Sequence, residues 1–168
     1  MNSSVILHIS QFVLLVLLQV LILNHINFLG YINPYAYLLF ILLYPISNNR
    51  QLFIFLSFIL GLTVDLFLDS GGVHAAACVT IAYLRPAFLK FSFGTSYEHQ
   101  TLKISSSEIG QRFGYFATII LLHHVILFSL EIFNTSDILL ILKKSLFSSI
   151  FTLIMCLILT VLFSRNSK

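Results

Sequence analysis

Charged side chains are scarce in this chain. Of its 168 residues, nine are Lys or Arg and six are Asp or Glu, whereas 58% are hydrophobic. An ordinary soluble domain carries about 25% charged residues, and fifteen charged side chains cannot cover the surface of a soluble protein of this size. We therefore expect an integral membrane protein. This composition excludes a soluble globular enzyme, a disordered tail and a disulfide scaffold.

Motifs that carry chemistry are also missing. The two cysteines, Cys78 and Cys156, lie inside apolar runs and belong to no CxxC or Cys/His pattern. The sequence has no nucleotide-binding loop, no nucleophile elbow and no metal-ligand spacing. Its basic residues are scattered, with no stripe that could follow a phosphate backbone. We expect no enzymatic activity, no cofactor, no metal site and no nucleic-acid partner.

Apolar runs recur along the whole chain and predict a single all-α domain, a polytopic bundle of five to six transmembrane spans. The second run is the exception: Pro34–Tyr44 has 11 residues before Pro45, too few to span a bilayer unaided at about 1.5 Å per residue. We expect it to be short, kinked or re-entrant. Residues Ile138–Lys144 are expected to form a separate interfacial helix. The expected spans are 5–23, 34–46 (short), 51–69, 73–91, 109–133 and 145–163.

The positions of the basic residues predict the orientation. If six segments cross and the amino terminus is cytoplasmic, only Lys143 and Lys144 lie outside, and Arg85 lies within a span. The positive-inside rule then places both termini in the cytoplasm, as expected for a multi-pass protein of the bacterial inner membrane. The basic residues of the inner side are Arg50, Lys90, Lys103, Arg112, Arg165 and Lys168.

Asp65 and Arg85 lie well inside the expected spans and need an explanation, because a charge in a bilayer is costly. Asp65 lies four residues before Asp69 on the same helical face. No second helix carries a matching aspartate, so we expect a structural or partner-contact role and not catalysis. Arg85 lies too far from Asp65 along the membrane normal for direct pairing. We expect it to extend toward the cytoplasmic headgroups, next to a possible kink at Pro86.

Polar groups and small residues also occur in the expected fifth span. His123 and His124 diverge by about 100° around the helix, whereas His124 and Glu131 share a face. Hydrogen bonding inside the bundle is the expected role, with a proton relay or metal site as the alternative. Gly110 and Gly114 have the small-xxx-small spacing of a close helix contact, within the chain or with a partner.

One stretch supports a more specific interpretation. The run Gly61–Ala77 (GLTVDLFLDSGGVHAAA), followed by Ala82–Pro86 (AYLRP), resembles the central signature of the rod shape-determining protein MreD family. Length, span number and scarcity of charge are similar too. The resemblance covers about 26 residues; elsewhere the chain matches only in hydropathy and span order.

The resemblance implies a non-enzymatic inner-membrane subunit of the cell-elongation machinery, which organises peptidoglycan synthesis and rod shape. The implied partner is MreC and, through it, MreB, RodA and a class B penicillin-binding transpeptidase. It also implies a fold similar to the membrane substrate-binding subunits of energy-coupling-factor transporters. The matching positions, which we call the signature residues, are Gly61, Asp65, Gly72, His74, Arg85 and Pro86.

The similar fold suggests a second hypothesis, a membrane subunit that binds a vitamin or another small molecule for uptake. This hypothesis predicts a closed polar cavity on the outer side of the membrane. Its walls would include Asp65, His74 or Glu131.

Overall fold

The computed structural model describes residues 3–26, 28, 32–46, 49–98 and 102–165. Apart from one isolated β-bridge between Phe28 and Ile32, these residues form helices and connections, which confirms the predicted all-α class. The α-helices are α1 (Ser3–Leu21), α2 (Leu38–Leu43), α3 (Arg50–Leu68), α4 (Val73–Phe93), α5 (Thr95–Glu98), α6 (Ile109–Ile132) and α7 (Ile138–Arg165). Short 3-10 turns lie at Leu23–His25, Ile104–Ser106 and Thr135–Asp137.

Five of these elements are long and apolar enough to cross a membrane, so the chain is a polytopic membrane protein. The spans are Ile6–His25, Arg50–Leu68, Val73–Phe93, Ile109–Ile132 and Ile138–Phe163. The expected break between an interfacial helix and a last span is wrong, because α7 is one helix of 28 residues. Neither proline nor glycine lies between Ile138 and Phe163, so nothing in the sequence interrupts the helix.

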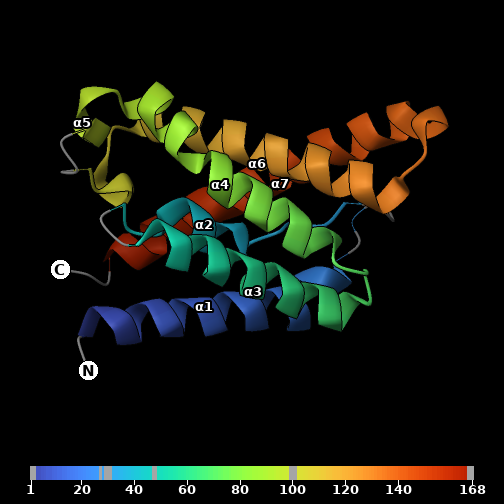
Figure 1. Cartoon of the computed structure of the whole chain (residues 1–168), viewed down its shortest axis with the longest axis horizontal. Coiled ribbons are helices and arrows are strands. Elements are labelled where there is room, and N and C mark those ends of the chain that lie inside the picture. Colours follow the sequence, from blue (N-terminus) through green and yellow to red (C-terminus); the bar gives the residue numbers. More distant parts are fainter. Residues whose placement is uncertain (1–2, 27, 29–31, 47–48, 99–101, 166–168) are drawn as a thin grey trace.

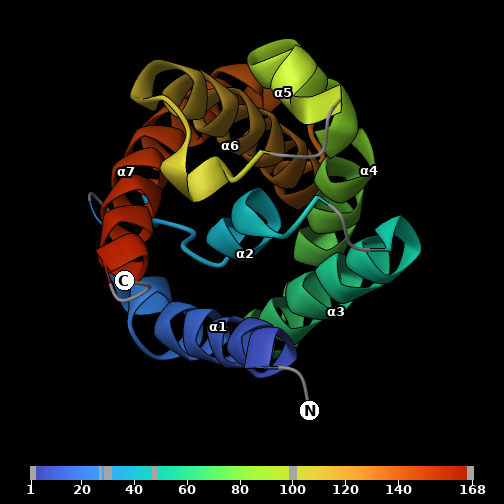
Figure 2. The ribbon, with the colours of Figure 1, turned by 90° about the vertical axis from the view of Figure 1, so that its left-hand side faces the viewer.

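The five long helices form a ring, and the second apolar segment runs through its centre (Figure 2). The chain returns through this interior from the end of α1 to the start of α3, so α2 does not form a sixth long span. The helix expected from Pro34 begins only at Leu38 and has six residues. Residues Ala36 to Leu42 are buried. Irregular backbone can lie at membrane depth when protein surrounds it, as it does here.

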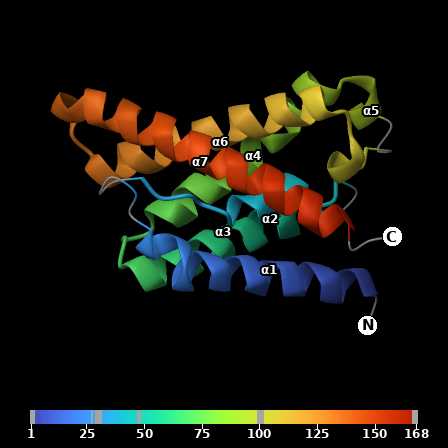
Figure 3. The same ribbon diagram turned by 180° about the vertical axis from the view of Figure 1, so that it is seen from behind.

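The ring has two distinct ends (Figures 1 and 3). At the first, called the Arg50 end, α1, α3 and α6 begin and α4 and α7 finish. At the second, called the Gly72 end, the α3–α4 and α6–α7 turns lie. The two ends of the described chain are therefore on the same side of the bundle, as predicted. The Arg50 end carries the described basic residues Arg50, Lys90, Lys103, Arg112 and Arg165; Lys168 lies outside the described residues.

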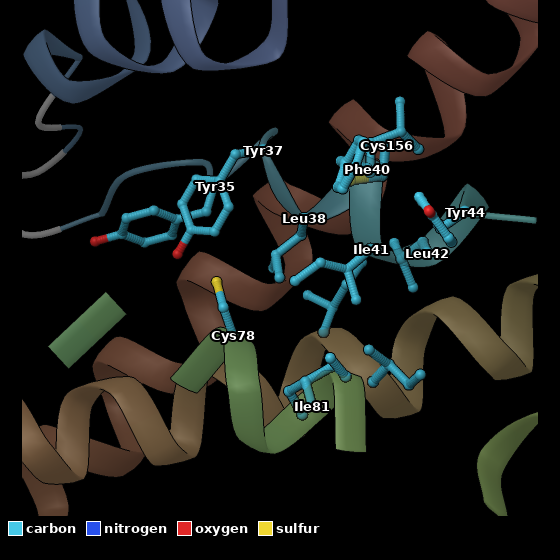
Figure 4. Close-up of a cluster of buried hydrophobic side chains, with 14 of the residues drawn as sticks. Tyr35, Tyr37, Leu38, Phe40, Ile41, Leu42, Tyr44, Cys78, Ile81 and Cys156 are labelled. Atoms are coloured by element: carbon cyan, nitrogen blue, oxygen red, sulfur yellow. The ribbon is translucent and has the colours of Figure 1, made fainter. Parts of the chain in front are cut away.

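The bundle is apolar outside and mixed inside. Leucine and phenylalanine side chains such as Leu66, Phe67 and Phe91 are exposed on the spans, where they can contact lipid. The interior combines apolar side chains from α2 with buried polar groups from all five long helices. Figure 4 shows the apolar part: Leu38, Ile41 and Leu42 project from α2 toward Ile81 on α4. The buried polar groups are therefore the candidates for function.

Candidate functional site

Asp65 connects α3 to the first turn of α4. The residue is 4% exposed, and its carboxylate accepts backbone N–H hydrogen bonds from His74 (to Oδ1, 3.0 Å) and Ala75 (to Oδ2, 2.8 Å). Ser70 Oγ donates a third bond of 2.6 Å to Oδ1. The first N–H groups of a helix have no partners within it, and a negative charge there is favourable. Asp65 therefore caps α4 from the preceding helix.

Gly61 lets the same two helices approach closely. A Cβ atom built on Gly61 would lie 2.5 Å from Ala75 Cα and 2.6 Å from the His74 carbonyl oxygen. Such distances are far inside van der Waals contact, so only glycine fits at this crossing. The turn beyond it reverses the chain through left-handed backbone at Asp69 (φ 52°), Gly71 (φ 68°) and Gly72 (φ 95°), a conformation that glycine adopts without strain.

Arg85 holds the internal segment in place from α4. Its side chain is 3% exposed. Its Nη2 donates to the Leu42 and Tyr44 carbonyl oxygens, and its Nε donates to the Tyr115 hydroxyl at 2.8 Å. Because Leu42 and Tyr44 lie at the carboxyl end of α2, the guanidinium satisfies carbonyls that a helix end leaves unpaired. We call Arg85, Tyr115, Leu42 and Tyr44 the arginine clamp.

The arginine clamp corrects one expectation for Arg85. The side chain does not extend to the headgroups, because backbone carbonyls inside the bundle offer closer acceptors than solvent. The guanidinium carbon also lies 4.9 Å above the Phe53 ring, a cation–π geometry. As expected, no ion pair between Asp65 and Arg85 is found. The helix α4 continues past Pro86 to Phe93.

A second polar cluster lies between the internal segment and the long helices. The Tyr37 hydroxyl is 2.8 Å from His74 Nδ1 and 3.2 Å from His123 Nε2. A hydroxyl has one proton to donate, so it donates to one imidazole and accepts from the other.

The cluster extends to α7 through His124. Its Nε2 is 3.3 Å from Thr152 Oγ1, which accepts a 2.9 Å hydrogen bond from the Tyr35 backbone N–H. We call Tyr35, Tyr37, His74, His123, His124 and Thr152 the tyrosine–histidine cluster. His123 Nδ1 is buried without a hydrogen-bond partner. The cluster ties the internal segment to α4, α6 and α7, as expected for histidines that hydrogen-bond inside a bundle.

Glu131 lies apart from this cluster. Its side chain is 42% exposed and forms an ion pair of 2.8 Å with Lys144. The Lys144 ammonium lies 5.0 Å above the Phe128 ring. Glu131 shares a helical face with His124, as predicted, but its carboxylate accepts a hydrogen bond from Lys144 and not from that imidazole. Among the described residues, no group of three or more His, Cys, Asp or Glu side chains can hold a metal ion.

The two glycines of α6 do not pack closely against the other residues that the structure describes. A Cβ atom built on Gly110 or Gly114 would meet no heavy atom within 4 Å. The small-xxx-small spacing of Gly110 and Gly114 therefore corresponds to no close helix contact among the described residues.

Sequence reasoning missed Tyr37, Tyr115 and Thr152. Tyr37 and Tyr115 were expected at the membrane interfaces, and Thr152 stands in an apolar run and was given no role. The signal that could have found them was the hydroxyl group itself. A buried hydroxyl without a hydrogen-bond partner is costly, so a tyrosine or threonine in a buried segment usually has such a partner.

No family model, no curated protein and no solved structure significantly matches the chain. The comparisons therefore identify no family. The fold and the apolar spans define the class of the protein: a polytopic membrane protein with an all-α bundle.

Proposed function

We propose that this chain is a non-enzymatic scaffold of the bacterial cell-elongation machinery, an MreD-like subunit that binds MreC in the inner membrane. Through MreC it would be linked to MreB, RodA and a class B penicillin-binding transpeptidase. The observation that carries the proposal is the coherence of the signature stretch. Gly61, Asp65 and Gly72 together build the α3–α4 hairpin.

Two further signature residues, His74 and Arg85, also have interior contacts. His74 bonds to Tyr37, and Arg85 holds the end of α2. A signature in which five of six members shape one bundle supports a protein that acts through its overall surface. This differs from a catalytic motif, whose members converge on a site open to substrate. We therefore propose that partners and lipid contact the apolar outer faces of the long helices.

The orientation forms part of the proposal. Basic residues gather at the Arg50 end, whereas Lys143 and Lys144 lie in the first turns of α7, near the Gly72 end. By the positive-inside rule the Arg50 end is cytoplasmic. The hairpin turn at Asp69–Gly72 would then face outward, on the side where the cell wall is synthesised.

The alternative, a substrate-binding subunit for uptake, required a polar cavity walled by Asp65, His74 or Glu131. Each of these side chains is already engaged by a different partner. Asp65 bonds to the start of α4, His74 to Tyr37, and Glu131 to Lys144. This distribution favours the scaffold over the uptake subunit.

Depletion of the protein tests the proposal in cells. We expect rod-shaped cells to become round when the chain is depleted, and wild-type protein to restore the rod. Asp69→Asn should restore it as well, because Asp69 does not cap α4 and asparagine tolerates left-handed backbone. Unchanged cell shape after complete depletion would contradict the scaffold role.

A further inference from the structure

A recess with two arginines opens at the Arg50 end of the bundle. It has a volume of about 120 Å³ and lies between the start of α3, the second half of α4, the end of the internal segment and α5. A single buried water needs only about 10–15 Å³ of such space, so the recess can hold a larger polar group. Its lining residues include Ile46, Arg50, Arg85 and Tyr97.

The two guanidiniums lie at different depths. Arg50 is the first residue of α3 and is exposed, which places it at the level of the lipid headgroups. Arg85 precedes the end of α4 at Phe93 by eight residues, or about 12 Å along the helix. The recess therefore leads from the headgroup level toward a buried positive charge.

The buried charge of Arg85 has no carboxylate partner among the described side chains. Its guanidinium donates hydrogen bonds to one hydroxyl and two carbonyl oxygens, all neutral. The ion pair found among those side chains, Lys144–Glu131, starts from the first turns of α7 near the Gly72 end. An uncompensated charge in a low-dielectric interior is costly, and a second cation at the mouth of the recess raises the positive potential further.

We propose that this recess binds a phosphate group, which Arg50 and Arg85 hold from the rim and the base. Guanidinium recognises phosphate through charge-assisted hydrogen bonds. Because Nε and Nη2 of Arg85 already donate within the arginine clamp, Arg85 contributes Nη1 and its positive charge, and Arg50 contributes its guanidinium from the rim. Basic pockets between transmembrane helices bind anionic lipid headgroups in the same way. The phosphate can come from an anionic phospholipid or from soluble phosphate, and the experiment separates these sources. The proposal does not depend on the partnership with MreC.

The first arm measures lipid retention. The full chain is purified in detergent with an equimolar mixture of phosphatidylglycerol and phosphatidylcholine, and retained lipids are counted by native mass spectrometry. We expect retention of phosphatidylglycerol over phosphatidylcholine. Arg50→Gln should weaken this retention by about fivefold, and Ile46→Trp, which fills the recess, should abolish it. Lys143→Gln, an exposed cation outside the recess, is the matched control and should change nothing.

The second arm titrates inorganic phosphate into the delipidated protein by calorimetry. Phosphate binding that both recess variants weaken, without a lipid preference, supports the same site with a soluble source. Equal retention and equal phosphate binding in all variants overturn the proposal, as does the absence of binding in both arms. Glu98→Gln is included as a further variant, because Glu98 follows Tyr97, which lines the recess. Phosphate or lipid binding found only in this variant also overturns the proposal. Both recess variants must elute as monodisperse protein with wild-type helicity.

Discussion

Oδ2 of Asp65 accepts a 2.8 Å hydrogen bond from the backbone N–H of Ala75, ten residues further along the chain. Gly61, one helical turn earlier on α3, packs directly against the backbone of the same residue, Ala75. A glycine contact and a carboxylate cap, one helical turn apart on α3, therefore fix the crossing of α3 and α4. Because both contacts act on the backbone, they specify the helix pair whatever side chains surround it.

Replacing Asp65 tests the cap. Asp65→Asn keeps the shape but turns an NH₂ group toward backbone N–H donors, and leaving such buried donors unpaired costs about 1–3 kcal/mol. The free energy of unfolding, measured by SDS titration in micelles, should fall by that amount. Asp69→Asn is the same chemical change four residues later and should stay within about 0.5 kcal/mol of wild type. Equal effects of the two variants would contradict the capping role.

Adding one methyl group tests the close approach. Gly61→Ala should destabilise the bundle by about 1–3 kcal/mol, because the new Cβ overlaps the α4 backbone and the helices must separate. Gly114→Ala meets open space and should be neutral or stabilising by up to about 1 kcal/mol, since alanine favours helix over glycine. Thermal unfolding of the two variants in the same detergent gives the comparison. A neutral Gly61→Ala would contradict the observed packing.

The arginine clamp makes a local prediction. Arg85→Lys keeps the charge but cannot reach both carbonyl oxygens and the Tyr115 hydroxyl at once. Each hydrogen bond lost from a charged group costs about 1.5–3 kcal/mol. Amide hydrogen exchange at residues 38–44 should therefore accelerate strongly, and Tyr115→Phe should produce a smaller change of the same kind. Unchanged exchange in this segment would show that Arg85 does not hold α2.

Orientation is testable with single cysteines. The native Cys78 and Cys156 are fully buried, so the wild-type background should react little with a membrane-impermeant maleimide. Asn134→Cys, in the exposed α6–α7 turn, should react in intact spheroplasts. Ser106→Cys, which is exposed just before α6, should react only after permeabilisation. The reverse pattern would place the Arg50 end outside the cell.

Much of the fold could be predicted from the hydropathy pattern. The four runs that became α1, α3, α4 and α6 were placed to within a few residues, because each is a long apolar segment that ends at a turn signal. The second run was recognised as too short to span. Its path through the interior could not be predicted, since it depends on five helices that close around it. The uninterrupted α7 was missed because Lys143 and Lys144 suggested an interface where the helix simply continues.

The polar interior was harder to predict than the spans. Asp65 and His123 were identified as buried polar groups, because each stands out in an apolar run. Their partners were not identified, since Asp65 bonds to backbone atoms and His123 bonds to Tyr37, a residue 86 positions away. Arg85 was assigned to the headgroups for the same reason: its acceptors are carbonyls of the internal segment, which a sequence does not display.

The central claim is that this bundle is a binding partner of MreC, and direct binding tests it. The full chain is reconstituted in nanodiscs of neutral lipid and titrated with purified full-length MreC in its own nanodiscs or detergent, followed by fluorescence anisotropy. We expect saturable one-to-one binding that Asp69→Asn preserves and Asp65→Asn weakens, through displacement of α4. Absence of binding by correctly folded wild-type protein would contradict the account.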